Sequence, residues 1–204
     1  MITKKQMGIL SVFKKDIFAE LTFSQIKKGS KQKSNSVVQT ALKRFRELEL
    51  LKAKKIADVT VYSLNMDSNT AMACLNLLNE AEIREKKLPK MILQAIQDRI
   101  SRYTDFFTLI VFGSYAKQQA KKNSDLDIAV IVESEQTKKN IAPYLETIKR
   151  RETTAIDYHI FTREEMLEML EAEDENLGKQ IHSSGTVYYG LIPYYQAIKR
   201  KKNA

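Results

Sequence analysis

The sequence is poor in the residues that build disulfide-stabilised and metal-stabilised domains. Its 204 residues include one cysteine, Cys74, and two histidines, His159 and His182. A single cysteine excludes an internal disulfide framework and a cysteine-rich zinc site. No apolar run approaches the roughly 18 residues that a membrane-spanning helix needs, and the start, MITKKQMGIL, lacks the apolar stretch of a signal peptide. We therefore expect a cytoplasmic protein without a membrane partner.

Acidic residues are scarce only in the first third of the chain. Residues 1–66 contain 14 lysines and arginines against 5 aspartates and glutamates, whereas residues 67–204 contain 20 of each kind. The excess charge of +9 therefore belongs entirely to the first 66 residues. A basic excess confined to one segment indicates two domains, one of which binds a polyanion.

The basic segment carries the signals of three helices followed by a β-hairpin. Residues 1–16 place apolar side chains near one face of a helix. Thr22 and Gln25 have the spacing of a capping box, and Ser36 and Gln39 repeat that spacing at the start of a longer helix. Two strand-like runs, LLKAKKI and VTVYSLN, complete the segment.

This order of elements resembles a winged helix-turn-helix domain over about residues 1–66. In that fold the third helix enters the major groove of DNA and the hairpin wing contacts the backbone. The resemblance implies double-stranded DNA as a partner, and the one-sided charge favours it because counterion release strengthens DNA binding. Glu49 departs from the pattern, since many winged helices place a glycine before the first wing strand. The alternative is a three-helix module that packs against protein and carries solvated lysines.

The resemblance assigns individual contacts by position. The residues implied to face bases are Asn35, Ser36, Gln39, Thr40 and Lys43, and those implied to face phosphates are Lys31, Lys33, Arg44, Lys54 and Lys55.

Residues 67–87 are expected to form a linker helix, and residues 88–204 a second domain. Met72, Leu75, Leu78 and Ile83 recur at helical spacing in the linker. Two packings fit that stripe. It pairs with a second copy of the chain, which would give a homodimer, or it packs on its own domain.

Two aspartates interrupt an otherwise apolar strand in the second domain. Residues 106–112, FFTLIVF, have strand composition, and the next strand reads LDIAVIV. Side chains two apart on a strand share a face, so Asp125 and Asp127 project together with Cα atoms roughly 6.7 Å apart. Burying two unpaired carboxylates is costly, and a divalent cation between them removes that cost. Mg²⁺ suits such an oxygen site when phosphate oxygens complete it.

The glycine and serine between the two strands favour a phosphate ligand. Gly113 lets backbone N–H groups approach a phosphate closely, and the hydroxyl of Ser114 can donate to a phosphate oxygen. The segment after them, YAKQQAKK, is expected to form a short helix whose N-terminus adds partial positive charge.

The combined pattern resembles the nucleotidyltransferase superfamily of the DNA polymerase β type, specifically its minimal nucleotidyltransferases. That family has Gly-Ser, nine to thirteen residues, and then Asp-x-Asp on a strand; here ten residues separate Ser114 from Asp125. The resemblance implies that Asp157, in TTAIDYHIFT, is a third acid that binds one metal ion and orients or deprotonates the attacking hydroxyl. Gln118 departs from the pattern, because the family commonly has glycine there. His159 shares the strand face of Asp157, and we interpret it as a packed residue.

We predict an α+β protein: a winged helix-turn-helix domain at residues 1–66, a linker helix at 67–87, and a small mixed-sheet nucleotidyltransferase domain flanked by helices at 88–204. The leading interpretation is a metal-dependent enzyme that moves a nucleoside monophosphate from an NTP, with ATP as the expected nucleotide, to an acceptor hydroxyl. The implied catalytic and metal-binding residues are Asp125, Asp127 and Asp157, with two Mg²⁺ ions, and the nucleotide-binding residues are Gly113 and Ser114.

Three alternatives stay open. The chain is a DNA-binding transcriptional regulator whose second domain only binds nucleotide, an antitoxin-like protein that modifies a partner protein, or a degenerate domain that keeps the fold without turnover.

Overall fold

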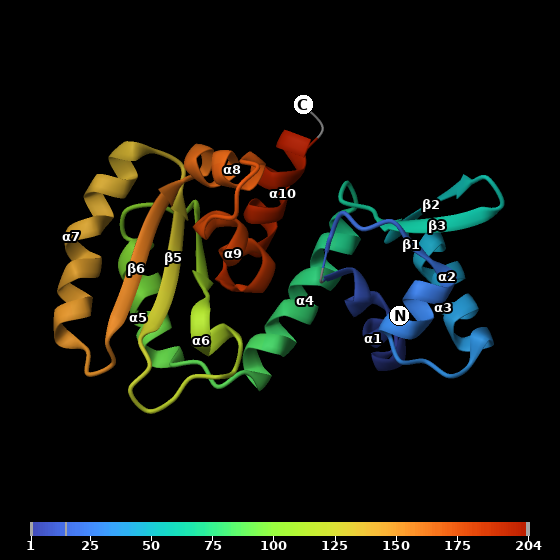
Figure 1. Ribbon diagram of the computed structural model, residues 1–204, viewed down its shortest axis with the longest axis horizontal. Coiled ribbons are helices and arrows are strands. Elements are labelled where there is room, and N and C mark those ends of the chain that lie inside the picture. The colour runs from blue at the N-terminus through green and yellow to red at the C-terminus, as the bar shows by residue number, and fades with distance from the viewer. Residues whose placement is uncertain (1, 15, 203–204) are drawn as a thin grey trace. The chain divides into compact units, whose positions relative to one another are not determined.

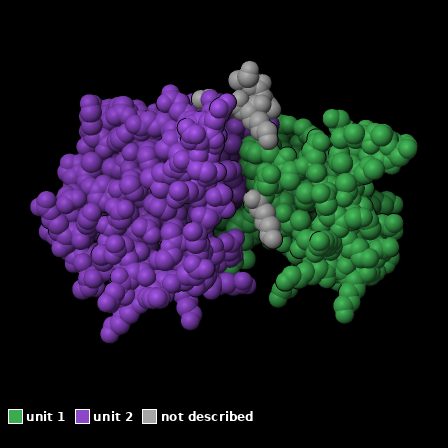
Figure 2. Space-filling view, viewed as in Figure 1, with its two compact units in different colours: residues 1–81 green, residues 82–204 purple. Residues whose placement is uncertain are grey.

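A computed structural model describes residues 2–14 and 16–202, and within them the chain forms ten α-helices and two β-sheets (Figure 1). The chain divides into two compact units, residues 1–81 and 82–204, with the boundary inside α4 (Asn69–Glu85) (Figure 2). The mixed α+β class expected from the sequence is confirmed. In the described part of the chain, no helix combines the length and the apolarity needed to cross a membrane.

Unit 1 combines short helices with a small antiparallel sheet in the order β1-β3-β2. Three of its helices precede a hairpin formed by β2 and β3, and the longest of these three, α3, buries Val38, Leu42 and Phe45 in the core of the unit. The elements are α1 (Lys4–Leu10), the 3₁₀ helix η1 (Ser11–Lys14), β1 (Leu21–Thr22), α2 (Phe23–Gly29), α3 (Asn35–Glu47), β2 (Leu51–Ile56) and β3 (Val59–Leu64), followed by most of α4.

Side-chain caps determine where the helices of unit 1 begin. The hydroxyl of Thr22 accepts the N–H of Gln25, and the Gln25 side chain accepts the N–H of Thr22, so this predicted capping box is confirmed. The predicted cap at Ser36 is wrong. Ser34 caps α3 by accepting the N–H of Val37, because a second serine two residues earlier offers the same hydroxyl to a helix that starts sooner.

The apolar stripe predicted along the linker is largely covered within the single chain. Met72, Leu75 and Ile83 of α4 are buried, and Leu78 is half-buried. Most of the stripe is therefore removed from water without a second copy of the chain.

Unit 2 is a four-stranded mixed sheet in the order β6-β5-β4-β7, with β5 and β6 parallel and the other pairs antiparallel. The helices α7 and α8 lie on different sides of it (Figure 1). The elements are α5 (Lys90–Ile100), β4 (Phe107–Val111), α6 (Gly113–Ala116), β5 (Leu126–Val132), α7 (Glu135–Arg151), β6 (Ile156–Thr162), α8 (Arg163–Glu171), α9 (Leu177–Ser184), β7 (Thr186–Tyr189) and α10 (Leu191–Lys202).

Side chains along β5 alternate between the core of unit 2 and the opposite face of the sheet. Ile128 and Val130 point into a core that they share with Leu93 of α5 and Leu145 of α7. Each fully buried side chain of this kind stabilises the fold by roughly 1.5–3 kcal/mol. The intervening residues face the other side of the sheet, and Asp127 is one of them.

The helix predicted after the Gly-Ser pair is shorter than expected and begins earlier. It forms the single turn of α6, from Gly113 to Ala116, in place of a helix over residues 115–122. The chain leaves the helix because Gln118 adopts a left-handed conformation, with φ of +57°.

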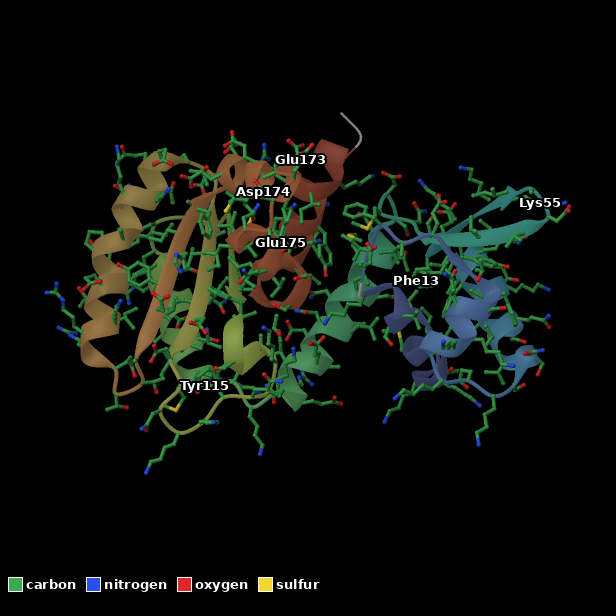
Figure 3. All side chains as sticks on the ribbon, in the orientation of Figure 1. Phe13, Lys55, Tyr115, Glu173, Asp174 and Glu175 are labelled. Atoms are coloured by element: carbon green, nitrogen blue, oxygen red, sulfur yellow. The ribbon has the colours of Figure 1, made fainter. Side chains whose placement is uncertain are left out.

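The last predicted helical stretch, residues 163–184, is interrupted. It forms α8 and α9, and an exposed loop that includes Glu173, Asp174 and Glu175 separates them (Figure 3). Asn176 ends this loop as the N-cap of α9, where its side chain accepts the N–H of Lys179 at 3.1 Å.

Candidate active site

The parallel pairing of β5 with β6 brings two of the predicted acids side by side. Asp127 and Asp157 are register partners, so their Cα atoms lie on neighbouring strands roughly 4.8 Å apart and their side chains leave the same face. Asp125 is exposed and precedes the first residue of β5. The three acids therefore gather where both strands begin.

Gly113 leaves the space that the Asp127 side chain occupies. Its φ of +61° is left-handed, and a Cβ at this position would collide with Oδ2 of Asp127 and lie 2.7 Å from its Cγ. The neighbouring Phe112 N–H donates to the Asp127 carbonyl oxygen at 3.0 Å, which joins the end of β4 to β5. Only a glycine allows the backbone and this carboxylate to approach so closely.

The backbone of Ser114 is bonded to Asp127, although the sequence suggested that it would face a phosphate. Its N–H donates a hydrogen bond to the Asp127 carboxylate. The Ser114 hydroxyl, by contrast, has no hydrogen-bond partner among the described residues, and the residue is half-buried. The Gly-Ser pair therefore holds the acid with its backbone and presents a free hydroxyl beside it.

Asp127 is the acid whose ionisation the site opposes. Burial, followed by repulsion from the carboxylates of Asp157 and Asp125, raises the pKa of Asp127 above its ordinary value. The Ser114 N–H and the nearby His159 act in the opposite direction and lower that pKa. The surroundings thus lack the positive charge that three ionised carboxylates need, and a bound cation would supply it.

The acids do not form a complete metal cage on their own. Within residues 2–14 and 16–202, no three histidine, cysteine, aspartate or glutamate side chains are grouped so that they could hold a metal ion. Their chemistry still fits Mg²⁺, which binds through one or two carboxylates and takes further oxygens from water and substrate phosphates. The arrangement is therefore one that a phosphate-bearing substrate would have to complete.

His159 lies beside the third acid and packs between aromatic rings. Its Nε2 is 3.4 Å from Oδ2 of Asp157. Its ring is nearly parallel to that of Phe161, with centroids 6.0 Å apart, and it is tilted against that of Phe112 at the same separation. These contacts fit the packed role expected for His159, and they also place its side chain next to the site.

Ser124 closes the turn that leads into Asp125. Its hydroxyl accepts the N–H of Lys121 at 2.8 Å, and its own N–H donates to the Lys121 carbonyl oxygen at 3.0 Å. Ser124 thus has a local structural role, which is to hold the turn before the acidic pair.

Gln118 fixes the loop between the two halves of the motif, a role that the spacing of the motif did not reveal. Its side-chain Nε2 donates to the carbonyl oxygen of Tyr115 on α6 at 2.8 Å, and its Oε1 accepts the N–H of Lys87 at 3.0 Å. Glycine would adopt the same left-handed backbone more easily but would form neither bond. The glutamine side chain therefore stabilises, through two hydrogen bonds, a backbone conformation that glycine would adopt more easily.

The residues predicted to contact DNA all lie in unit 1. On α3, Gln39, Thr40 and Lys43 are exposed, and their side chains have no partner in the described part of the chain. They lie opposite the buried stripe of the same helix. This face is therefore available to a ligand without rearrangement.

The other α3 residues predicted to contact DNA are already engaged. Asn35 accepts a hydrogen bond from Lys27 Nζ at 2.6 Å, and the hydroxyl of Ser36 lies 2.9 Å from that of Ser34. Arg44 forms an ion pair with Glu47 at 3.2 Å. These side chains would have to exchange partners to contact DNA.

Four lysines surround α3 in sequence and remain exposed. Lys31 and Lys33 lie between α2 and α3, and Lys54 and Lys55 lie on β2, with Lys55 near the turn of the hairpin (Figure 3). A neighbour on the same strand, Lys52, differs because it pairs with Asp67 at 2.8 Å.

Part of the chain matches a known protein family. Residues 94–190 match the family model described as Polymerase beta, Nucleotidyltransferase, which is slightly less than half of the sequence. No curated protein and no solved structure matches the chain. The matched segment contains the Gly-Ser pair and all three acids. The match supports the nucleotidyltransferase part of the expected identity, and it indicates a transferase.

Proposed function

We propose that the second unit transfers a nucleoside monophosphate from an NTP to an acceptor hydroxyl. The observation that carries this proposal is the register of Asp127 with Asp157, together with Gly113 and Ser114 packed against the Asp127 carboxylate. In the reaction, the acceptor oxygen forms a bond to the α-phosphorus, the bond from that phosphorus to the bridging oxygen breaks, and pyrophosphate leaves. The hydroxyl proton passes to a base.

Asp125, Asp127 and Asp157 are the residues that would hold Mg²⁺ in this proposal. When bound, the metal supplies positive charge that stabilises the transferring phosphoryl group. The raised pKa of Asp127 supports a cation at this position, since the carboxylates repel one another without one.

The remaining steps belong to side chains around the acids. Asp157 is exposed on the edge strand β6, where an acceptor hydroxyl can reach it, and it orients that hydroxyl and takes its proton. The free hydroxyl of Ser114 donates to a triphosphate oxygen. A hydrogen bond to a charged oxygen contributes about 1.5–3 kcal/mol.

The test is metal-dependent release of pyrophosphate from each NTP in the presence of candidate acceptors. Wild type should release it, whereas Asp127→Asn should lose turnover and keep the fold. Asp174→Asn is the matched control, because it removes the same charge from the exposed loop between α8 and α9 (Figure 3). Equal turnover in wild type and Asp127→Asn would remove the acid from the mechanism.

A nucleotide-binding regulator is the rival within the same unit, and Ser114→Ala distinguishes the two. In an enzyme this change lowers kcat/KM for the NTP by about ten- to a hundredfold, since 1.4 kcal/mol corresponds to about one decade. In a regulator it weakens nucleotide binding by a similar factor, and neither protein releases pyrophosphate. Unchanged affinity together with unchanged turnover would exclude Ser114 from the site.

Unit 1 supports a second function, which is binding of double-stranded DNA by a winged helix-turn-helix. The order of three helices and a hairpin, and the unpartnered polar face of α3, are the observations that favour it. Gln39, Thr40 and Lys43 would face bases, and the lysines of the wing would face phosphates.

The salt dependence of DNA binding tests this assignment on the full chain. Lys54→Ala should lower the slope of log K against log salt concentration by about 1, because one phosphate contact is lost. Lys52→Ala, on the same strand, should change the slope less, since Asp67 already neutralises that lysine. Lys43→Ala should alter sequence preference more than either. Binding that does not respond to salt would give unit 1 a protein-contact role.

A further inference from the structure

A second concavity lies on unit 2, away from the acids. A pocket of about 250 Å³ is lined by the last residues of β5, Ile131 and Val132, whereas Asp127 is near the start of that strand. Val132 lies five positions after Asp127, which corresponds to roughly 16 Å along a strand. The pocket is therefore separate from the nucleotidyl-transfer site.

The interior of the pocket suits a compact apolar group. Its volume is slightly below the roughly 300–1,000 Å³ typical of pockets for drug-sized ligands. The Tyr194 hydroxyl is bonded to His182 Nδ1 at 2.9 Å, so this tyrosine presents its ring and not a free hydroxyl to the pocket. The apolar lining includes Phe106, Phe107, Ile131, Met166, Tyr194 and Ala197.

Glu133 supplies a partly free carboxylate to the lining. Its Oε1 accepts hydrogen bonds from the hydroxyls of Thr104 at 2.9 Å and Thr137 at 3.0 Å. Its Oε2 has no partner among the described residues. Two hydroxyl groups thus fix the orientation of the carboxylate while one oxygen stays available to an N–H donor.

Arg163 supplies the opposite charge. One terminal nitrogen of its guanidinium lies 3.5 Å from Glu164, and its other donors have no partner in the described structure. Arg163 and Glu133 both line the pocket without forming an ion pair with each other. The lining therefore offers a ligand the free N–H donors of the Arg163 guanidinium and one free carboxylate oxygen of Glu133.

An exposed aromatic side chain also lines the pocket. Phe106 is 73% exposed although it contributes to the lining. Its N–H donates to the Thr104 hydroxyl at 3.0 Å, and that hydroxyl in turn donates to Glu133. These bonds link the backbone of Phe106 to the Glu133 carboxylate through Thr104, and a ligand in the pocket would remove part of the exposed ring from water.

We propose that this pocket binds a free α-amino acid with a branched or aromatic apolar side chain. The carboxylate of the ligand pairs with Arg163, its ammonium group with Oε2 of Glu133, and its side chain fills the apolar interior. The Glu133 carboxylate would repel a simple anion, and the Arg163 guanidinium would repel a simple cation. Only a zwitterion with an apolar body satisfies both charges and the lining together.

Isothermal titration calorimetry on the full chain tests the proposal with L-leucine and L-phenylalanine as probes. Both should bind saturably at one site. L-Leucinamide, which lacks the carboxylate, and N-acetyl-L-leucine, which lacks the ammonium group, should each bind about ten- to a hundredfold more weakly, because each loses one charge-assisted hydrogen-bonding partner. L-Alanine should bind at least about tenfold more weakly, since it leaves most of the apolar interior unfilled.

Variants assign the charges to their partners. Arg163→Gln should weaken leucine binding by the same factor as the amide does and should not weaken leucinamide binding further. Glu133→Gln should weaken leucine binding by the same factor as acetylation of the ammonium group does, and it should not weaken N-acetyl-L-leucine binding further. Arg150→Gln is the matched control, because it removes a 77% exposed arginine of α7 that pairs with Glu146 and does not line the pocket. It should bind leucine like wild type.

Two further results would overturn the proposal. The first is the absence of saturable binding by any apolar amino acid at millimolar concentration. The second is leucine binding of wild-type strength in Ala197→Phe, which fills the pocket, or in Arg163→Gln. Asp127→Asn should leave leucine binding unchanged, so the outcome does not depend on nucleotidyl transfer.

Discussion

Replacing Gly113 by alanine tests how the chain holds Asp127, whose pKa is raised by burial and by the neighbouring carboxylates. A residue with a Cβ at a left-handed φ costs roughly 1–2 kcal/mol, and Gly113 has φ of +61°. The added Cβ would also lie 2.7 Å from Cγ of Asp127, whereas ordinary van der Waals contact begins at 3.4 Å. The carboxylate must therefore move by at least 0.7 Å, which is the difference between these distances.

In the proposed mechanism, such a displacement of Asp127 is large. A misplacement of about 1 Å lowers turnover roughly a hundredfold. We expect Gly113→Ala to lose about 1–2 kcal/mol of unfolding free energy from backbone strain and about two decades of kcat/KM. Urea denaturation measures the first effect, and pyrophosphate release per folded molecule measures the second.

Gly190→Ala separates strain from displacement of the acid. Gly190 also has a left-handed φ, +78°, and a Cβ there would approach Cα of Thr108 to 3.0 Å, at the pocket end of β4. This variant should be at least as destabilised as Gly113→Ala but should keep wild-type kcat/KM per folded molecule. Wild-type kcat/KM in Gly113→Ala, or an equal loss in Gly190→Ala, would refute the reasoning.

Three other substitutions test smaller features. Because the folded-state pKa of Asp127 is raised, its ionised form opposes folding, and the associated stability is present at acidic pH and lost as pH rises through the folded-state pKa. Metal-free Asp127→Asn should therefore be more stable than wild type at neutral pH but not below about pH 3.9. An equal gain in the free energy of unfolding at both pH values, measured by urea denaturation, would contradict this. Glu49→Gly should raise the unfolding free energy by up to about 1 kcal/mol, because it removes strain at a φ of +54°. Gln118→Gly should give no such gain, since it loses two hydrogen bonds that contribute about 0.5–1.5 kcal/mol each; an equal gain in both variants would mean that these bonds contribute nothing.

The strands around the site could be predicted from the sequence because their side-chain pattern is strict. An apolar run with two acids one residue apart has few interpretations, and β5 places Asp127 on one face and Ile128 on the other as that pattern requires. The pairing of Asp127 with Asp157 depends on parallel registration of strands some thirty residues apart, which no local pattern specifies. It was accessible through the family resemblance alone.

Local choices between similar residues could not be predicted in the same way. Ser34 and Ser36 offer the same hydroxyl to the start of α3, and only the packing of the helix decides that Ser34 is the cap. Likewise, the alanine and lysine content after Ser114 favours a helix, yet the left-handed Gln118 stops α6 after one turn. Propensity is a weak prior where the tertiary structure determines the course of the chain.

The two positions at which the resemblances predict a glycine that the chain lacks share one backbone conformation. Glu49 and Gln118 both have positive φ, +54° and +57°, so the turns that normally use glycine are kept without it. At Gln118 the side chain itself stabilises the turn, through the Tyr115 carbonyl and the Lys87 N–H. At Glu49 the stabilisation comes from elsewhere, because the Asn65 side chain donates to the Glu49 carbonyl oxygen at 2.9 Å. A missing glycine is therefore not evidence against a left-handed turn when hydrogen bonds of about 1 kcal/mol each can offset a strain of roughly 1–2 kcal/mol.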